Sequence, residues 1–321
     1  MAMKSLVTGG AGFIGSHLCE ALLARGDEVV AFDNLSTGAL ANLGACSAHA
    51  RFRFVQGDIL DRAAFERASE GASRIWHLAA AVGVRLVMER GIDTIVTNTH
   101  GTENALAVAA RAGARILVAS SSEVYGKMGA SQAHPLRESD DWRLGTTSTR
   151  RWAYACTKAL DEFLALAWRD ERGLEVVVPR LFNTVGPRQS PSYGMVLPAF
   201  VAAAREGRSL RVHGDGSQTR CFSHVSDSVA MLVGLMECPR ALGEVVNVGS
   251  DRELSIAELA RLVIDAHGGR SSIEFVPYAS VYGSGFEDME RRTPDLAKVR
   301  RLLGGAPSRT IEEIIVELGH A

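Results

Sequence analysis

The stretch S-L-V-T-G-G-A-G-F-I-G-S-H-L-C-E-A-L-L-A-R-G, residues 5–26, decides the fold. It joins a short apolar run to a helix-like apolar run through glycines at positions 9, 12 and 15. Glycines at this spacing allow a tight turn and let backbone N–H groups approach a pyrophosphate at the positive end of a helix. The order of strand, glycine-rich turn and helix therefore predicts a dinucleotide site at the start of the chain.

Acidic residues stand where the next two strands end. The run at 28–32 ends at Asp33, eighteen residues after Gly15. A carboxylate there accepts hydrogen bonds from an adenosine ribose and repels a 2′-phosphate, which favours NAD over NADP. Asp33 could instead only open the turn-rich loop D-N-L-S-T-G. Asp58 also has two open interpretations, as a contact to adenine or as the cap of a helix that begins near Asp61.

Further strands and helices alternate as far as a sixth strand near residue 180. The strand R-I-W-H-L-A-A-A, residues 74–81, ends in small residues that leave room for a flat cofactor. We interpret His77 within it as a core histidine. Asn98 lies in a predicted helix over 94–112, where it either hydrogen-bonds a strand end across the site or satisfies local backbone groups. The alternation predicts an α/β, Rossmann-type doubly wound parallel sheet.

A candidate catalytic region lies between Ser120 and Lys158. Ser120, Ser121, Ser122 and Glu123 follow an apolar strand, so they are expected at its carboxyl end, where open α/β sheets place their chemistry. Tyr154 and Lys158 are four residues apart in a helix-prone run, which puts both on one helix face. The fixed positive charge favours the phenolate and would make the tyrosine a base near neutral pH. Tyr-x-x-x-Lys alone is a weak signal, because helices often carry this pair.

The last third of the chain changes in character. Loops and short elements dominate from about residue 190, yet V-V-N-V-G-S at 245–250 is typical of another strand of the sheet. We therefore expect a Rossmann domain over 1–181, with that strand returning to it, and a smaller, interwoven C-terminal substrate-binding lobe over 182–321. Arg291 and Arg292 follow a loop rich in glycine and aromatic residues. They either face an anionic group or lie on the solvated surface.

Composition excludes several classes of protein. The 321 residues are 46% hydrophobic and carry a formal net charge of −2, which gives no electrostatic footprint for nucleic acid or an anionic membrane. No apolar run approaches the roughly 20 residues that span a bilayer. Five scattered cysteines, with no C-x-x-C pair, indicate reduced thiols and no metal site. The N-terminus shows no leader, so we expect a soluble cytoplasmic enzyme.

Several motifs together resemble one family, the extended short-chain dehydrogenase/reductases that modify nucleotide sugars. They are T-G-G-A-G-F-I-G-S-H-L, S-S-S-E-V-Y-G, Y-A-C-T-K, R-L-F-N-T-V-G-P-R, S-Q-T-R-C-F-S-H-V-S-D and R-T-P-D-L-A-K-V-R-R-L-L-G. They occur in the family's order and cover essentially the whole chain. Within the family the sequence is most similar to UDP-glucuronate decarboxylases, including UDP-xylose synthases and the decarboxylase domain of the lipid A aminoarabinose pathway.

The resemblance implies a role for each candidate catalytic residue. Tyr154 would take the proton of the sugar C4 hydroxyl, and Lys158 would hold the nicotinamide ribose and lower the tyrosine pKa. Ser121 or Ser122 would hydrogen-bond the C4 oxygen. Glu123 matches a glutamate that the decarboxylases keep, and Arg292 matches their arginine near the sugar carboxylate. The substrate contacts that the resemblance implies are Asn183, Val196, Leu197, Arg220, Tyr282 and Arg292.

The motifs and the resemblance together also define the expected NAD site. Its contacts are Gly9, Gly12, Phe13, Ile14, Gly15, Asp33, Asn34, Ser36, Thr37, Gly38, Asp58, Ile59, Leu78, Ala79, Ala80, Ala81, Asn98, Tyr154 and Lys158. The resemblance further implies a homodimer in which the helices over 94–112 and 154–169 pair into a four-helix bundle.

Three alternative functions have to be compared with decarboxylation. A 4-epimerase acting on UDP-glucuronate or UDP-glucose would share every step up to a 4-ketone, although many epimerases have a small or hydroxyl residue where Glu123 stands. A 4,6-dehydratase is disfavoured, because those enzymes carry Asp-Glu in place of Ser122-Glu123. A non-catalytic NAD-binding protein is disfavoured by the presence of Tyr154, Lys158 and the serines. Decarboxylation of UDP-glucuronate to UDP-xylose, to a UDP-4-keto-pentose or to both is the leading hypothesis.

Overall fold

A parallel sheet forms the centre of the protein. The computed structural model describes residues 3–127, 134–190, 195–282, 289–306 and 309–320. The strands lie in the order β3-β2-β1-β4-β5-β7-β12, with β6 paired to β7. Their bounds are β1 Lys4–Thr8, β2 Glu28–Asp33, β3 Phe52–Gln56, β4 Arg74–His77, β5 Arg115–Val118, β6 Ser120–Ser121, β7 Val176–Leu181 and β12 Val245–Val248. The order reverses between β1 and β4, where open α/β sheets bind their ligands. The predicted doubly wound sheet is confirmed.

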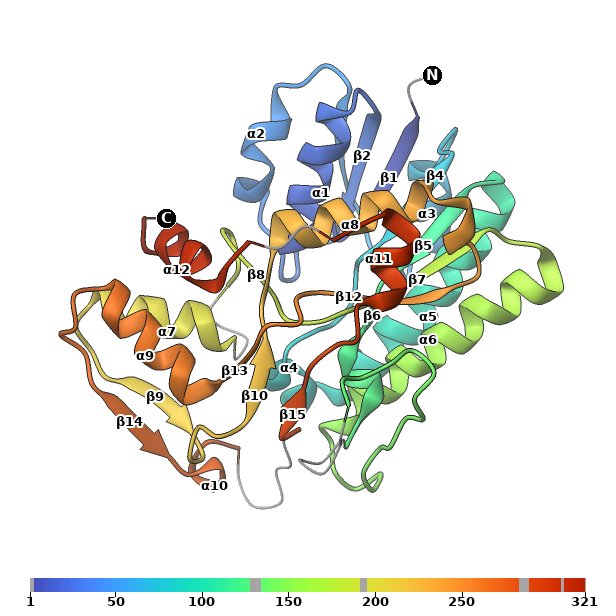
Figure 1. Ribbon diagram of the computed structural model, residues 1–321. Coiled ribbons are helices and arrows are strands. Elements are labelled where there is room, and N and C mark those ends of the chain that lie inside the picture. Colours follow the sequence, from blue (N-terminus) through green and yellow to red (C-terminus); the bar gives the residue numbers. More distant parts are fainter. Residues whose placement is uncertain (1–2, 128–133, 191–194, 283–288, 307–308, 321) are drawn as a thin grey trace.

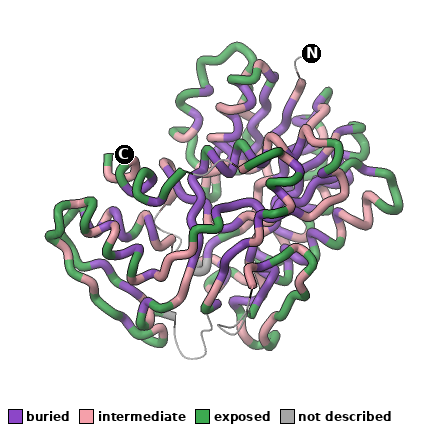
Figure 2. The backbone as a smooth tube through the Cα atoms, in the orientation of Figure 1, coloured by how far each residue is buried: buried purple, intermediate pink, exposed green. Residues whose placement is uncertain are grey.

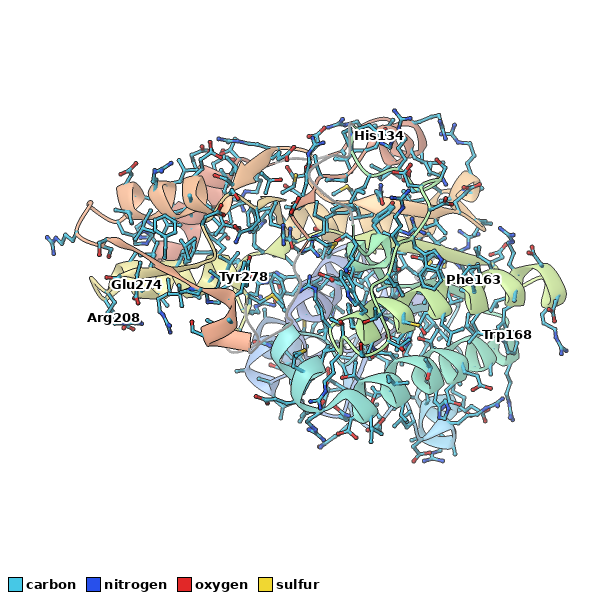
Figure 3. The ribbon with its side chains drawn as sticks, turned by 90° about the horizontal axis from the view of Figure 1, so that it is seen from below. His134, Phe163, Trp168, Arg208, Glu274 and Tyr278 are labelled. Carbon is cyan, nitrogen blue, oxygen red and sulfur yellow. The ribbon has the colours of Figure 1, made fainter. Side chains whose placement is uncertain are left out.

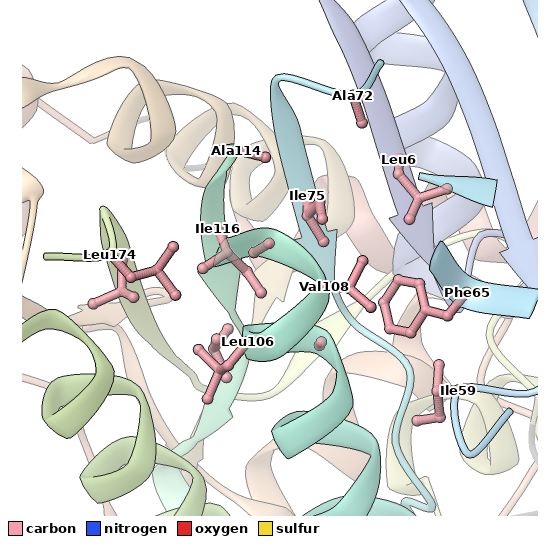
Figure 4. Close-up of a cluster of buried hydrophobic side chains, with 14 of the residues drawn as sticks. Leu6, Ile59, Phe65, Ala72, Ile75, Leu106, Val108, Ala114, Ile116 and Leu174 are labelled. Carbon is pink, nitrogen blue, oxygen red and sulfur yellow. The ribbon is translucent and has the colours of Figure 1, made fainter. Parts of the chain in front are cut away.

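Helices cover both faces of this sheet, so its strands are apolar along their length. In β1, Leu6 packs toward one face and Val7 toward the other, each in a separate hydrophobic cluster. The Leu6 face carries α3 (Arg62–Ala68), α5 (Gly91–Ala112) and α6 (Trp152–Arg172), and Figure 4 shows this core. The opposite face carries α1 (Phe13–Ala24), α8 (Val225–Glu237) and α11 (Ala297–Leu303). Buried backbone follows the strands in Figure 2.

Local signals explain where the long helices end. α5 and α6 stop at Gly113 and Gly173, which adopt left-handed conformations that glycine reaches without a steric cost. Both helices begin earlier than expected, at Gly91 and at Trp152, because neither start has a side-chain cap that the sequence could reveal. By contrast, α9 (Ile256–Ala266) begins at a capping box formed by Ser255 and Glu258, which is a start signal that can be recognised in a sequence.

A smaller lobe lies beside the sheet, at the lower left of Figure 1. Its core joins α7, α9 and α12 to the paired strands β9 and β14. A second small sheet places β10 between β13 and β15, and β8 pairs with β11. The remaining bounds are α2 Gly44–Ser47, α4 Val84–Glu89, β8 Thr184–Val185, α7 Val196–Arg205, β9 Leu210–His213, β10 Thr219–Cys221, β11 Ser223–His224, β13 Glu253–Ser255, β14 Ile273–Val276, α10 Tyr278–Tyr282, β15 Arg291–Arg292 and α12 Ile311–His320.

The chain crosses between the sheet and the lobe several times. β12 pairs in parallel with β7, with Val245 opposite Val178, so the returning strand expected at 245–250 is part of the central sheet. α8 also returns to pack beside α1. The expected interwoven lobe is therefore present, while the domain limits at residues 181 and 182 stay a prediction. Among the described helices, none has the length and hydrophobicity needed to cross a membrane. All five cysteines are free thiols.

Candidate active site

A cavity of about 1220 Å³ runs from the glycine-rich turn to the smaller lobe. It follows the carboxyl ends of the central strands, passes Tyr154 and Lys158, and reaches Arg211 and Tyr278 in the lobe. Pockets for one drug-sized ligand are usually about 300–1,000 Å³. The cavity is therefore large enough to hold a cofactor and a second ligand end to end, at the sheet position where α/β proteins bind such molecules.

The glycine-rich turn fits a dinucleotide because it leaves the backbone exposed to the cavity. A Cβ added to Gly15 would lie 2.0 Å from the Gly9 carbonyl oxygen, so only glycine allows this approach of α1 to the turn. Gly9 has a φ of +69°, and a Cβ there would lie 3.0 Å from the Ala79 nitrogen. The N-cap residue of α1 is Gly12, which has no side chain with which to cap the helix. The first N–H groups of α1 are thus suited to a pyrophosphate.

Asp33 combines the two roles that the sequence left as alternatives, a place in the cofactor site and a place in the turn. It lines the cavity, and it also organises the turn, because its carboxylate accepts from Ala11 N at 3.0 Å and from Leu35 N at 2.7 Å. Burial raises the pKa of Asp33, and these two backbone hydrogen bonds oppose that shift. Leu35 adopts a left-handed φ of 61° at this turn. The carboxylate therefore fixes the loop that would surround an adenosine ribose.

Asp58 is not a helix cap. Its carboxylate accepts from Asn34 Nδ2 and from Leu60 N, both at 2.9 Å, and it lines the cavity. Asp61 caps α3 instead, accepting from Ala64 N at 3.0 Å. The interpretation of Asp58 as a helix cap was wrong, because Asp58 forms an Asx turn three residues before Asp61, the residue that caps α3.

Most of the expected cofactor contacts line one end of the cavity, and two do not. Asn98 lies behind the wall, where its Oδ1 accepts from Ala81 N at 2.8 Å and its Nδ2 donates to Thr157 Oγ1 at 3.1 Å. It thus holds the strand end against α6. Gly38 packs against Ala11, whose oxygen would lie 2.9 Å from an added Cβ. The expected contacts that line the cavity are Gly9, Gly12, Phe13, Ile14, Gly15, Asp33, Asn34, Ser36, Thr37, Asp58, Ile59, Leu78, Ala79, Ala80, Ala81, Tyr154 and Lys158.

The serines and the Tyr154–Lys158 pair meet at the middle of the cavity. Tyr154 is partly buried, and its hydroxyl hydrogen-bonds Ser121. Burial raises the pKa of Tyr154 by more than the positive charge of Lys158 lowers it. The predicted effect of Lys158 on the pKa of Tyr154 is thus present, but the spacing of residues along the chain does not show the desolvation that outweighs it. Burial would lower the pKa of Lys158, but Asp161 and other neighbours hold it above its usual value.

A charged cluster lies beside these groups. Glu123 accepts hydrogen bonds from Arg292 and, at 3.3 Å, from Arg151 NH2. Arg292 also donates to Asn183 Oδ1 at 2.5 Å. Arg292 is 8% exposed and lines the cavity, whereas Arg291 turns away from it and pairs with Glu253 at 2.9 Å. Of the two adjacent arginines, Arg292 reaches the candidate site, whereas Arg291 lies outside the cavity.

The lobe end of the cavity contains the other expected substrate residues. Asn183, Val196, Leu197 and Arg220 line it, and the side chain of Tyr282 lies outside the described residues. Sequence reasoning missed a polar group here. Gln218 Nε2 donates to the Tyr278 hydroxyl and to the His213 oxygen, each at 2.9 Å, and all three residues line the cavity. Figure 3 shows Tyr278 on this lobe. The alternation of β9 would have identified His213 as facing away from the core.

The fold and this cavity define an α/β enzyme that uses a dinucleotide. A family model for the NAD dependent epimerase/dehydratase family matches residues 5–249, and the chain belongs to that family. NAD is its cofactor. UDP-N-acetyl-alpha-D-glucosaminuronate decarboxylase of Bacillus cytotoxicus is 38% identical over 99% of this chain and 97% of its own length. UDP-glucuronic acid decarboxylase 1 of Danio rerio is 39% identical over 97% of this chain and 70% of its own length.

Solved structures of several enzymes share the fold. dTDP-glucose 4,6-dehydratase of Streptomyces venezuelae, solved with NAD bound, superimposes with a TM-score of 0.88 at 31% identity, over 99% of this chain and 96% of that one. UDP-glucose 4-epimerase of Thermotoga maritima, solved with UDP-glucose, gives a TM-score of 0.88 at 27% identity, over 99% and 98% of the two chains. The fold alone therefore does not separate dehydration, epimerisation and decarboxylation.

Proposed function

We propose that the protein is an NAD-dependent decarboxylase of UDP-glucuronate. The observation that carries this proposal is the pairing of Arg292 with Glu123 and Asn183 in the cavity that contains Tyr154. A guanidinium at this position suits the carboxylate of a uronic acid, which is the group that distinguishes such a sugar from glucose. The names of the Bacillus and Danio relatives support a substrate of this class.

Oxidation at the sugar C4 would be the first step. Tyr154 would take the proton of the C4 hydroxyl, and Ser121 or Ser122 would hydrogen-bond the same oxygen. Lys158 would hold the nicotinamide ribose and stabilise the phenolate. NAD supplies the acceptor for the C4 hydride. The residues of the chain therefore have to orient the sugar and move one proton, which leaves a 4-ketone in the β position to the C6 carboxylate.

Loss of CO₂ then follows from the chemistry of a β-keto acid. The C5–C6 bond breaks, its electron pair passes into an enolate that ends on the C4 oxygen, and a proton is added at C5. Arg292 would orient the carboxylate through this step, and the hydroxyls at Ser121 and Ser122 would stabilise the developing negative charge on the C4 oxygen. The product is a UDP-4-keto-pentose, which is either released or reduced to UDP-xylose.

The alternative is a 4-epimerase, which would act on UDP-glucuronate or UDP-glucose and keep all six sugar carbons. Both activities would use Tyr154 and Lys158, so the two proposals differ in the use of Arg292. Incubation with NAD and UDP-glucuronate labelled at C6, followed by mass spectrometry and CO₂ trapping, separates them. Label in CO₂ and a pentose product support the proposal. A galacto-configured uronate with all label retained would contradict it. The 2-acetamido analogue, tested in parallel, shows which C2 substituent the cavity accepts.

We also propose that the protein is a homodimer through α5 and α6. Both helices carry large apolar side chains in contact with solvent, of which Ile92 is 80% exposed and Phe163 is 63% exposed. Ile95 and Leu160 are exposed on the same two helices. Figure 3 shows Phe163 on α6. Single apolar residues on a surface are ordinary, but several on two paired helices favour an interface.

A further inference from the structure

A buried carboxylate lies behind the Tyr154–Lys158 pair. Asp161 is on α6, three residues after Lys158, and its Oδ2 accepts from Lys158 Nζ at 3.0 Å. Asp161 is 0% exposed and Lys158 is 3% exposed. Among the residues that line the cavity, Lys158 is present and Asp161 is absent. Asp161 therefore has no direct access to a ligand, and its effect on the cavity passes through its neighbours.

The pairing of Asp161 is incomplete, which is unusual for a group placed only for stability. In the described part of the chain its Oδ1 has no well-aligned hydrogen-bond donor, and the Thr102 hydroxyl lies near the carboxylate. Half of a buried carboxylate left without a donor costs folding free energy, and such groups concentrate at functional positions. Burial accordingly raises the pKa of Asp161, although Lys158 and the Thr102 hydroxyl oppose that shift. Burial of the Asp161 carboxylate thus costs folding free energy, which the contacts with Lys158 and Thr102 offset only in part.

Asp161 is the main charged partner of Lys158, because the other acidic groups nearby are paired elsewhere or lie further away. On α6 it faces Lys158, Tyr154 and Glu162, and Thr102 approaches it from α5. Glu162 is committed elsewhere, since it accepts from Arg180 NH2 at 2.7 Å and from Ser120. On β4, His77 is completely buried, and burial lowers its pKa to about 3, so it is neutral above mildly acidic pH. Glu123, outside α6, also raises the pKa of Tyr154 through its charge.

Charge at Asp161 acts on both members of the pair in the same direction. It helps to hold the pKa of Lys158 above its usual value against the effect of burial. It also contributes, after burial and together with Glu123, to the raised pKa of Tyr154. Two groups that interact this closely titrate as a unit, and a negative charge beside the unit makes each loss of a proton harder.

We propose that Asp161 is a positioning residue that fixes the Lys158 ammonium beside Tyr154 and sets the pH at which the Tyr154 hydroxyl gives up its proton. This inference rests on the proposed roles of Tyr154 and Lys158 as the base and its activator. A negative charge that opposes the phenolate keeps Tyr154 protonated at rest. The tyrosine would then ionise only when further positive charge reaches the cavity, which limits base activity to the loaded site.

The test compares Asp161→Asn with the wild type in two measurements. The first is the ultraviolet absorbance of tyrosinate against pH in the free protein, with the Tyr154→Phe protein subtracted so that only Tyr154 is observed. Loss of the charge should move this titration to lower pH by about one unit. The second is the pH profile of kcat/KM, which reports groups of the free enzyme and should move in the same direction. A purely structural role would lower kcat/KM at every pH without moving the profile.

Three further variants control the experiment. Asp227→Asn removes a carboxylate that is 6% exposed on α8, outside the cavity, and should leave both measurements unchanged. Asp161→Glu keeps the charge and should keep the wild-type titration even if stability falls. Asp161→Ser supplies the neutral variant if the asparagine protein does not fold. An unchanged Tyr154 titration in a folded neutral variant would overturn the inference. Because that titration needs no substrate, it decides this point even if UDP-glucuronate is not turned over.

Discussion

Arg292 and Glu123 are 169 residues apart in the chain and pair directly in the wall of the cavity. Arg292 reaches this position because β15 pairs with β10 in the smaller lobe, with Arg292 opposite Arg220. Glu123 follows β6 in a short 3₁₀ turn at the carboxyl end of the central strands. The ion pair therefore joins the lobe to the sheet at the point where we place the sugar carboxylate.

Replacement of Arg292 tests its proposed role in decarboxylation. Arg292→Ala should lower CO₂ release at least ~100-fold, because the carboxylate of the substrate loses its charged partner. CO₂ release and NADH absorbance, followed together, measure this effect. Arg291→Ala is the matched control, since Arg291 pairs with Glu253 outside the cavity and its loss should change the rate little. Wild-type CO₂ release from the Arg292 variant would contradict the assignment.

Replacement of Tyr154 tests the proposed base. Tyr154→Phe should lower kcat by about 10²–10⁴-fold, because the C4 hydroxyl proton loses its acceptor. NAD should still bind, because the phenylalanine ring fills the same space as the tyrosine ring. Tyr125→Phe removes a different buried hydroxyl, which donates to Asn247 at 2.8 Å away from the cavity. That control should lose stability and keep activity. The mechanism is wrong if the Tyr154 variant turns over at the wild-type rate.

Asp33 should determine the preference for NAD over NADP. Asp33→Asn keeps the shape of the side chain but removes the charge that repels a 2′-phosphate. We expect NAD affinity to fall and the ratio of the two dissociation constants to narrow by about tenfold, or about 1.4 kcal/mol. Calorimetric titration with each dinucleotide measures this ratio. Asp61→Asn removes a charge from the exposed cap of α3 but keeps an oxygen that can accept from Ala64 N, so it should leave the ratio of the two dissociation constants unchanged.

His77 should make the protein sensitive to acid. Its ring contacts Thr8 Oγ1 at 2.9 Å and Thr102 Oγ1 at 3.2 Å, and burial lowers its pKa to about 3. The unfolded chain then binds a proton below about pH 6.5 that the folded protein does not, so stability falls as the pH drops from 6.5 toward 3. We expect a loss of about 2 kcal/mol between pH 6.5 and 5 from this residue.

Urea unfolding at these two pH values measures that loss. In the His77→Gln protein the free energy of unfolding should fall by about 2 kcal/mol less between pH 6.5 and 5 than in the wild type, whatever the absolute stability of the variant. His100→Gln on α5, where the side chain is exposed, should keep the wild-type dependence. An equal slope in the wild type and the His77 variant would show that His77 does not cause the acid sensitivity.

The proposed dimer predicts the effect of a charge on α6. Phe163→Glu places a carboxylate on the apolar surface formed by α5 and α6, so it should convert the dimer into monomers. Sedimentation velocity measures the change. Phe275→Glu introduces the same charge at a phenylalanine that is 54% exposed on β14, and this variant should remain dimeric. A monomeric wild type at micromolar concentration would contradict the proposal.

Local sequence was sufficient for the elements whose signals lie within a few residues. The glycine-rich turn and the returning strand at Val245–Val248 both lie where their motifs predict. The residues predicted to contact the cofactor came from these motifs together with the family resemblance, and most of them line the cavity. Asn98 and Gly38 are exceptions. Both were predicted to contact the cofactor, but their side chain or backbone packs behind the surface of the cavity.

What the sequence by itself determined is the sheet, the turn at α1 and the types of residue in the cavity, because backbone geometry and hydrophobic period are local properties. Only the tertiary structure decided which charges meet. It brought Arg151 and Arg292 onto Glu123, placed Asp161 behind Lys158, and gave Tyr154 a raised pKa. Ion pairing and desolvation depend on distance and burial in three dimensions, and neither quantity is contained in the spacing of residues along the chain.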